Sequence, residues 1–367
     1  MRVLFQIRRN IKDFPGGDVI QMLKTKQYLQ DLGVHVGLSL DSAPDCSSYD
    51  IVHLFNITDI RDTYVQCKNA KNQGRVVALS PIYWPTREFR ASGASRHWIR
   101  SIIPASPKRL ARYLIYHLLR EDRPTALLAR IGELQMQHEV LTISDLILPN
   151  SRMELQMLLA DFDRLGRDKF AVVPNGVDTK IIDMTAHRAG AKQRDTVLCV
   201  ARIEARKNQL RLISALRDVP VPLVFVGKIP NTGYARACLA IAKRRGNTRF
   251  VGPVPHEQLR SIYISARVHV LPSWYETPGL SSLEAALAGC NIVVSDRGSV
   301  REYFAQHAWY CDPTNEQSIK TAILQAYTAP MNTKLARIIS KRYDWKVAAR
   351  LTLTAYERAL DNLINMH

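Results

Sequence analysis

The residues best suited to chemistry lie in one stretch, VHVLPSWYETPGLSSLEAALAG, where an apolar run passes through a loop into an amphipathic run. Gly279 in that loop lets the backbone approach a ligand closely. The first amides of the predicted helix, those of Leu280, Ser281 and Ser282, form an anion site that the helix dipole reinforces. The stretch therefore predicts a phosphate site at the start of a helix.

Two carboxylates flank this anion site. Glu276 precedes it in the loop and Glu284 follows it in the first helical turns, so the pair can bracket a phosphorylated ligand from opposite ends. Carboxylate oxygens accept hydrogen bonds from sugar and ribose hydroxyls. Taken alone, Glu284 is better explained as an acid that favours a helix N-terminus.

Two cations follow an earlier strand-like run. VLCVARIEARKN puts Arg202 at the end of a strand and Lys207 five residues later, near the start of a helix. Cations at the carboxyl edge of a parallel sheet suit a diphosphate. Surface charge is the competing interpretation, because Arg206 and Arg211 lie nearby, but the spacing favours a site. The 10 His form no HExxH or similar spacing, so we predict no metal site.

The elements that must position these residues alternate between strand-like and helical runs through all 367 residues. Such alternation predicts parallel sheets wrapped by helices. The expected strands are 1–8, 33–40, 49–56, 74–82, 145–151, 195–202, 221–228, 248–254, 266–273, 290–296 and 308–313. The expected helices include 18–33, 256–266, 281–289 and 345–364.

The same pattern predicts two Rossmann-like domains. A strand-like run ends in Pro174, Asn175 and Gly176, and a polar stretch follows, so we place the boundary there. The N-terminal domain is expected to span 1–174 and the C-terminal domain 175–345. Residues 346–367 are expected to form a helix able to pack back on the N-terminal domain.

Three features of the chain need a separate interpretation. Gly16 and Gly17 lie between a strand-like run and a helix, where their amides could face a phosphate, although a lone Gly-Gly turn is weak evidence. His53 is better explained as a buried strand histidine than as a catalytic one. The six cysteines form no CxxC pair, which favours reduced structural thiols.

The charge indicates an anionic partner. With 51 Lys+Arg against 33 Asp+Glu the net charge is +18, which suits nucleic acid, anionic lipid or a phosphorylated substrate. Residues 87–130 interleave basic and apolar side chains. This pattern is equally typical of a segment that binds an anionic membrane surface and of a helix with one solvated face and one face in the core. No apolar run reaches the roughly 20 residues that cross a bilayer, and no leader pattern follows Met1. We expect a cytoplasmic protein, able to contact the inner face of the membrane.

These motifs resemble those of one enzyme family. ETPGLSSLE is similar to the Glu, seven residues, Glu signature of retaining GT-B glycosyltransferases of family 4, which include bacterial mannosyltransferases and O-antigen and capsule enzymes. VPNGVD, VLCVARIEARKN and FVGPVPHEQLRSIYISARVHVLPS extend the similarity through the second half. The resemblance implies an α/β GT-B fold, with two Rossmann-like domains facing each other across a cleft.

The resemblance also implies roles for the carboxylates. It assigns Glu276 to the donor sugar near the reacting carbon and Glu284 to the nucleotide ribose. Donor binding would further involve Gly279, Leu280 and Ser281. Pro278 replaces the aromatic residue that the family usually has before the glycine, so the local sugar contacts differ from the family pattern.

Roles for the cations and glycines follow from the same resemblance. Arg202 and Lys207 would neutralise the leaving nucleoside diphosphate, which takes the place of a metal ion. Gly16 and Gly17 match a glycine-rich loop near donor and acceptor. The family strand that ends in an active-site His resembles 49–56, but its register puts Phe55 there and His53 two residues earlier.

The implied reaction moves a sugar with retention from a nucleotide diphosphate sugar, with no other cofactor, to a hydroxyl of a glycan or lipid-linked glycan. A GT-B nucleotide-sugar epimerase is one alternative, but Arg202 and Lys207 together with the two glutamates fit the transferases better. A basic nucleic-acid-binding protein would explain the charge of +18. No recognition-helix, RNP or zinc-finger pattern is present, so we expect no nucleic acid partner.

Overall fold

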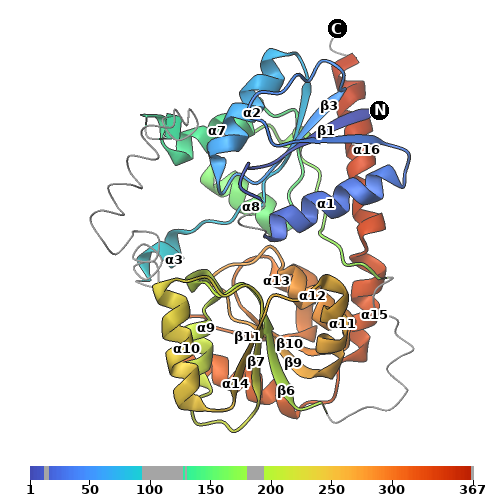
Figure 1. The fold of residues 1–367 in the computed structure, drawn as a ribbon. Coiled ribbons are helices and arrows are strands. Elements are labelled where there is room, and N and C mark those ends of the chain that lie inside the picture. Colours follow the sequence, from blue (N-terminus) through green and yellow to red (C-terminus); the bar gives the residue numbers. More distant parts are fainter. Residues whose placement is uncertain (12–15, 93–126, 129, 180–193, 365–367) are drawn as a thin grey trace. The chain divides into compact units, whose positions relative to one another are not determined.

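The computed structural model describes residues 1–11, 16–92, 127–128, 130–179 and 194–364, which form two compact units (Figure 1). The first unit comprises Met1–Trp84, Ala111–Gly176 and Trp345–His367, and the second comprises Pro85–Leu110 and Val177–Asp344. Most of the basic segment 87–130 lies outside the described residues.

A five-stranded parallel sheet forms the centre of the first unit, in the order β2-β1-β3-β4-β5. Its strands are β1 (Arg2–Gln6), β2 (His35–Ser39), β3 (Ile51–Phe55), β4 (Val76–Ser80) and β5 (Leu146–Ile147). β3 and β4 are buried along their whole length, as strands covered on both faces usually are. The five strands expected in the first half are confirmed.

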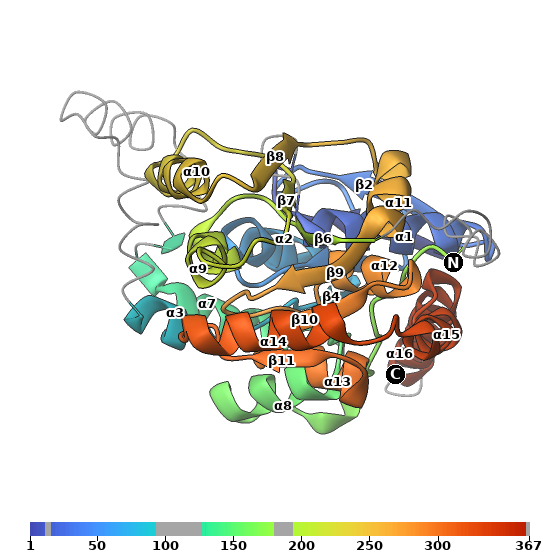
Figure 2. The ribbon, with the colours of Figure 1, turned by 90° about the horizontal axis from the view of Figure 1, so that it is seen from below.

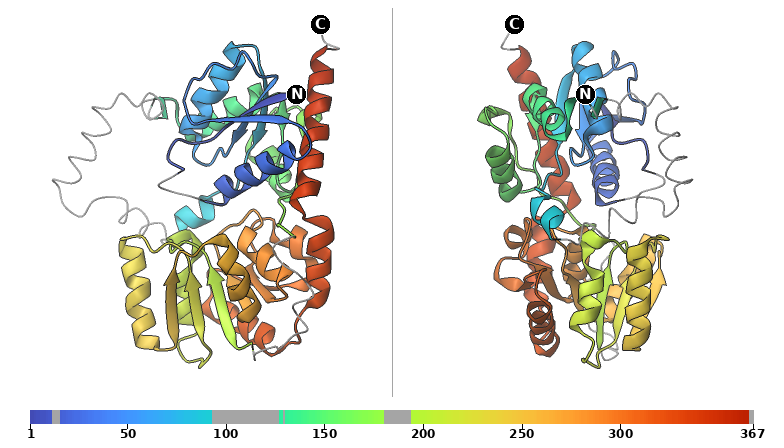
Figure 3. Two further views of the ribbon diagram at one scale, coloured as in Figure 1. Left: turned by 45° about the vertical axis from the view of Figure 1, so that its right-hand side comes forward. Right: turned by 90° about the vertical axis from the view of Figure 1, so that its left-hand side faces the viewer.

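Helices cover both faces of this sheet. They are α1 (Gly17–Gln30), α2 (Ile60–Asn72), α7 (Glu133–Ile143), α8 (Arg152–Asp161), the short η1 (Arg167–Lys169) and α16 (Trp345–Ile364). α1 packs against β2 and α16, whereas α2 packs against α7, β3 and β4. α16 runs beside α1 and also contacts β4 and β5 (Figure 3). The last helix therefore belongs to the core of the first unit.

The second unit contains a six-stranded parallel sheet in the order β11-β10-β9-β6-β7-β8 (Figure 2). Its strands are β6 (Thr196–Val200), β7 (Leu223–Val226), β8 (Thr248–Gly252), β9 (Ala266–Leu271), β10 (Asn291–Ser295) and β11 (Trp309–Cys311). The six strands expected in the second half are confirmed. The chain builds outward from β6 through β7 and β8 and then returns to the other side of β6 with β9, so the strand order reverses between β6 and β9.

Two groups of helices pack on this sheet. The helices are α3 (Arg87–Ala91), η3 (Ala205–Lys207), α9 (Gln209–Ala215), α10 (Gly233–Arg245), α11 (His256–Ser265), α12 (Leu280–Leu287), α13 (Val300–Phe304), η4 (Ala305–His307), α14 (Glu316–Thr328) and α15 (Thr333–Arg342). α9 packs against α10 and α14, while α12 packs against α11 and α15. The expected helices 256–266 and 281–289 correspond to α11 and α12.

The two units divide the chain differently from the simple boundary at residue 175. The join itself falls between Gly176 and Val177, but Pro85–Leu110 groups with the second unit. The physical reason lies in α3, where Phe89 is buried in the core of the second unit, with its ring centroid 6.1 Å from that of Trp274.

The six cysteines are all free and buried. Burial raises the pKa of Cys199 and Cys290 to about 12, which keeps both as neutral thiols. The expectation of reduced structural thiols is therefore confirmed.

His53 lies in the core of the first unit, on β3, with 1% of its surface exposed. Its Nε2 lies 2.9 Å from the hydroxyl of Ser80, and its Nδ1 lies 2.5 Å from the hydroxyl of Tyr356 on α16. Burial lowers the pKa of His53 to about 3, so the ring is neutral at physiological pH. His53 is a buried strand histidine, and it ties α16 to the sheet.

Replacing Tyr356 with Phe removes only the hydroxyl that bonds to His53 and leaves a buried ring nitrogen without a partner. We expect the first unit to lose about 1–2 kcal/mol of unfolding free energy. Urea denaturation followed by hydrogen exchange of the α16 amides measures this loss. Tyr49→Phe is the control, since Tyr49 lies in the same unit and is only half-buried. Equal losses in both variants would contradict the anchoring role of Tyr356.

Candidate active site

Charged side chains gather where the second sheet reverses its strand order. Arg202 comes shortly after β6, Lys207 ends η3, and Glu276 lies in the loop after β9, the neighbour of β6. In open parallel sheets, ligands bind outside the carboxyl ends of the strands at such a reversal, because the loops there run in opposite directions. The fold thus brings the three candidate catalytic residues to a position suited to a ligand.

A buried ion pair joins Lys207 to Glu276. The two side chains are 14% and 7% exposed, and Lys207 Nζ donates to Glu276 Oε1. Arg206 Nη1 lies 3.6 Å from the same oxygen, and its guanidinium lies over the ring of Tyr275, 5.2 Å from the centroid. Charges taken out of water destabilise a fold unless each has a partner of opposite charge. Here Glu276 is the partner of Lys207 and of Arg206.

Glu204 completes the charged cluster. One of its carboxylate oxygens lies 3.2 Å from Arg202 Nε, and the other lies 2.8 Å from Arg206 Nη2. Glu204 therefore bridges two cations and orients both. Sequence reasoning missed Glu204 and treated Arg206 as surface charge. The sequence feature that could have indicated this role is the run RIEARK, in which one acidic residue lies among three basic ones.

The charge states of the cluster follow from burial and neighbours. Burial raises the pKa of Glu276, but Lys207 and Arg206 lower it more, so that it lies below its ordinary value. Burial raises the pKa of Glu204 in the same way, and Arg206 and Arg202 bring it below its ordinary value. Burial and the neighbouring Arg206 lower the pKa of Lys207, while Glu276 opposes them. Three cations therefore face two carboxylates, which leaves an excess of positive charge for an anion.

The backbone of Glu276 is fixed by the loop after β10. The Ser299 amide donates to the Glu276 carbonyl over 3.1 Å. Gly298 has φ +80°, and a Cβ atom there would lie 2.0 Å from that carbonyl oxygen, so only glycine fits. Neither Gly298 nor Ser299 was predicted, because their proximity to Glu276 depends on the neighbouring position of β9 and β10.

The start of α12 leaves fewer free amides than the sequence predicted. Gly279 precedes the helix with φ +85°, followed by Leu280 and Ser281 as its first residues. The Ser282 amide donates to the Gly279 carbonyl over 2.9 Å, so the prediction that this amide is free is wrong. This hydrogen bond closes the first turn of the helix and leaves the Ser282 amide unable to bind a ligand. Among the described residues, the amides of Leu280 and Ser281 remain for a ligand.

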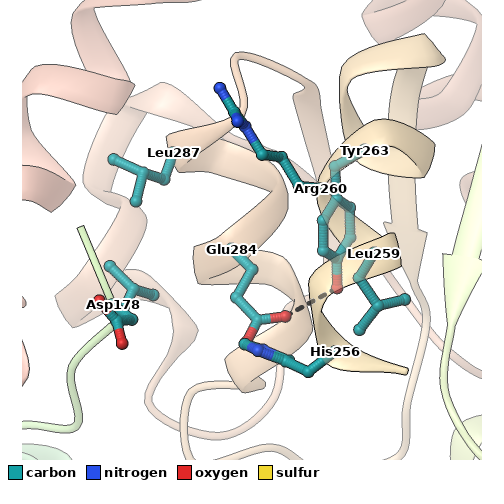
Figure 4. Close-up of a pocket in the computed structure, with 8 residues that line it drawn as sticks. Asp178, His256, Leu259, Arg260, Tyr263, Glu284 and Leu287 are labelled. Atoms are coloured by element: carbon teal, nitrogen blue, oxygen red, sulfur yellow. Dashed lines mark hydrogen bonds and ion pairs between the residues drawn. The ribbon is translucent and has the colours of Figure 1, made fainter. Parts of the chain in front are cut away.

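Glu284 lies in the second turn of α12 and faces α11 (Figure 4). Its Oε1 lies 2.8 Å from His256 Nε2, and its Oε2 accepts a hydrogen bond from the Tyr263 hydroxyl over 3.0 Å. The recess around this carboxylate is also lined by Val177, Asp178, Leu259, Arg260 and Leu287.

Gly16 and Gly17 lie in the first unit, with Gly16 just before α1 and Gly17 as the first residue of that helix. A Cβ atom on Gly16 would come within 2.6 Å of an Asp18 carboxylate oxygen. That carboxylate accepts from Arg8 Nε over 2.9 Å and from Asn56 over 3.0 Å. Gly16 therefore leaves room for a buried Arg8–Asp18 pair at the carboxyl ends of β1 and β3.

The described residues contain no group of three or more His, Cys, Asp or Glu side chains placed as metal ligands. The groups available to hold an anion are the guanidinium and ammonium groups of Arg202, Arg206 and Lys207, together with the first amides of α12. This set can neutralise a phosphate or diphosphate beside a carboxylate.

Comparison with known proteins first defines the fold. Sucrose-phosphate synthase from Thermosynechococcus elongatus is similar with a TM-score of 0.73 at 16% identity, covering 99% of this chain and 100% of that one. Anabaena HepE, in complex with UDP-glucose, is similar with a TM-score of 0.69 at 15% identity, covering 100% of both chains. The chain has the GT-B fold of glycosyltransferases.

Sequence similarity is concentrated in the second half of the chain. Residues 184–345 match the family model Glycosyl transferases group 1. O-antigen chain mannosyltransferase B of Escherichia coli is 28% identical over 44% of this chain and 45% of its own length. Glycogen synthase of Mycobacterium tuberculosis is 30% identical over 52% and 49%. The chain thus spans about half the length of the curated relatives it matches, and its residues 184–345 match the group 1 glycosyltransferases.

Replacing Glu276 with Gln keeps the shape of the side chain but removes the charge that pairs with Lys207. We expect a loss of about 1–3 kcal/mol of unfolding free energy at neutral pH, because a buried cation loses its counterion. The folded-state pKa of Glu276 is depressed, so its contribution is complete above the ordinary value of 4.5 and is lost as the pH falls through the depressed value.

Urea denaturation at pH 7 and at a series of lower pH values measures this difference. The matched control is Glu257→Gln on α11, because Glu257 is exposed. A difference between the Glu276 variant and wild type that stays constant into acid would contradict the assigned charge state.

Proposed function

We propose that the protein is a retaining glycosyltransferase that moves a sugar from a nucleoside diphosphate sugar to a hydroxyl acceptor. The observation that carries the proposal is the cluster of three cations, Arg202, Arg206 and Lys207, with Glu204 and Glu276, where the strand order reverses between β6 and β9. An excess of positive charge beside a sugar-binding carboxylate suits a sugar diphosphate. The group 1 match supports transfer as the reaction.

The leaving group explains the cations. As the bond between the anomeric carbon and the phosphate oxygen breaks, negative charge develops on the departing nucleoside diphosphate. Arg202, Lys207 and the amides of Leu280 and Ser281 stabilise that charge. Preorganised donors of this kind are effective because they need no reorganisation during the reaction.

Retention follows from attack on the face that the phosphate leaves. The acceptor oxygen bonds to the anomeric carbon, the phosphate oxygen departs with the electron pair, and the acceptor proton passes to that phosphate. No separate general base is required. Glu276 orients the sugar through its hydroxyls. Its pairing with Lys207 supports this role over that of a nucleophile, because the ion pair stabilises the carboxylate in its unreacted form.

The remaining residues complete donor binding. Glu284 accepts hydrogen bonds from the hydroxyls of the nucleotide ribose, and Gly279 allows the phosphate to approach the start of α12. Gly16 and Gly17, at the start of α1 in the first unit, supply backbone amides suited to a phosphate. The complexes of HepE with UDP and with UDP-glucose support a nucleotide sugar as the donor class.

A donor panel tests the reaction class. We expect one of the UDP-, GDP- or ADP-sugars to raise the melting temperature, because a ligand at 100 times its Kd stabilises a fold by about 2.7 kcal/mol. NMR of the product is expected to show the anomeric configuration of the donor. An isomeric nucleotide sugar formed without acceptor would instead indicate an epimerase.

The same assay tests the role of the cations. Lys207→Ala is expected to lower turnover by about 10²–10³-fold, the usual effect of losing a group that stabilises developing charge. Lys243→Ala on α10 is the matched control, since this exposed lysine lies outside the cluster. Near-normal turnover in the Lys207 variant would refute its assignment.

We further propose that the acceptor is a glycan or lipid-linked glycan at the cytoplasmic face of the membrane. The net charge of +18 and the basic segment 87–130 support an anionic surface. The names of two Escherichia coli relatives, O-antigen chain mannosyltransferase B and serotype-specific mannosyltransferase WbdA, support a surface polysaccharide. Within the described part of the chain, no helix is long and apolar enough to cross a bilayer.

Sedimentation with liposomes tests the membrane proposal. We expect binding to vesicles with anionic lipid at low ionic strength, release as salt is raised, and no binding to neutral phosphatidylcholine vesicles, because the attraction is screened within a Debye length. Failure to bind anionic vesicles at any salt concentration would overturn it.

A further inference from the structure

One face of α11 is directed at the carboxylate of Glu284. His256, Leu259, Arg260 and Tyr263 follow each other at helical spacing and all line the recess in which this carboxylate lies (Figure 4). Two of them contact Glu284 directly. The carboxylate is therefore held from a neighbouring helix and not from its own.

Both oxygens of Glu284 are engaged, one by each residue. His256 Nε2 lies 2.8 Å from Oε1, and the Tyr263 hydroxyl donates to Oε2 over 3.0 Å. The Tyr263 side chain is buried, whereas the side chains of Glu284 and His256 are 18% and 39% exposed. Tyr263 thus holds the carboxylate from inside the unit, and His256 holds it at the solvent side of the recess.

This arrangement leaves part of the carboxylate available to a ligand. An ionised carboxylate offers about four acceptor positions, of which His256 and Tyr263 occupy two. The other two can accept from a pair of neighbouring hydroxyls. A carboxylate already fixed in direction needs little further ordering when such a diol binds, so the two donors favour binding by preorganisation.

We propose that His256 is a positioning residue for nucleoside recognition. Its Nε2–H donates to Glu284 and fixes the carboxylate that accepts the ribose hydroxyls of a nucleoside diphosphate. His256 thereby sets the affinity for the nucleoside part of the donor and contacts neither the diphosphate nor the reacting carbon. The inference rests on the proposed function, since it takes Glu284 as the ribose ligand.

Calorimetric titration of the full chain with UDP, GDP, ADP and inorganic pyrophosphate tests this role. His256→Phe removes the donor and keeps a planar ring, and it is expected to weaken binding of the preferred nucleoside diphosphate roughly ten-fold. Pyrophosphate lacks ribose, so its affinity is expected to stay unchanged. His256→Gln places an N–H group near the position of Nε2 and is expected to restore most of the affinity.

A double-mutant cycle locates the effect. In a Glu284→Gln background, which removes the charge that His256 orients, His256→Phe is expected to cause little further loss. In turnover assays, His256→Phe is expected to raise the donor KM by about the same factor by which it weakens nucleoside diphosphate binding, roughly ten-fold. The kcat value is expected to stay unchanged. Because His256 is partly exposed, its variants should melt near the wild-type temperature.

Each other outcome has a definite meaning. Equal weakening of nucleoside diphosphate and pyrophosphate would indicate a general structural effect and overturn the positioning role. Unchanged nucleoside diphosphate affinity in His256→Phe would overturn it directly while leaving the proposed function intact. If wild type binds pyrophosphate but no nucleoside diphosphate, the proposed function fails first, and this role fails with it.

Discussion

The candidate site of the second unit depends on two opposite charges held out of water, Lys207 and Glu276. A buried pair of this kind costs desolvation energy that only close geometry and further partners offset. Arg206 and Glu204 supply those partners, and the close approach of Gly298 fixes the Glu276 backbone. Before a ligand arrives, the charges neutralise one another incompletely. The fold therefore holds in place a local positive potential that an anion can complete.

The first unit also has a buried ion pair where the strand order of its sheet reverses, but this pair has no excess of positive charge. Its strand order reverses between β1 and β3, and the buried pair Arg8–Asp18 lies at their carboxyl ends. Here the guanidinium is shared between Asp18 and the side-chain oxygen of Asn10, and Asn56 donates to the carboxylate. The charges cancel, so this pair shapes the loop at Gly16, whereas the cluster around Glu276 keeps a net charge for a ligand.

The local sequence pattern was enough to predict the strands and helices. The contacts that it missed depend on residues far apart in the sequence. The expected strands all exist because buried parallel strands are apolar runs bounded by turn residues, a signal contained in a few neighbouring positions. The motif residues Arg202, Lys207 and Glu276 were readable from type and spacing. The bridging role of Glu204, the contact of Gly298 with Glu276 and the donors to Glu284 were not, because they depend on which loops and helices become neighbours in three dimensions. The prediction of a free Ser282 amide was wrong for a local reason, because this amide bonds to the Gly279 carbonyl and closes the first turn of α12.

The path of the chain has a consequence for how the protein is made. β1 and α16 belong to the same unit, yet Val177–Asp344 separates the earlier part of that unit from α16. During synthesis on the ribosome, the complete sheet of the second unit emerges before Tyr356 can reach His53. Until then the sheet of the first unit lacks one of its covering helices and exposes apolar surface. The inserted unit therefore has the earlier opportunity to fold, in contrast to the usual N-terminal-first order of multidomain chains.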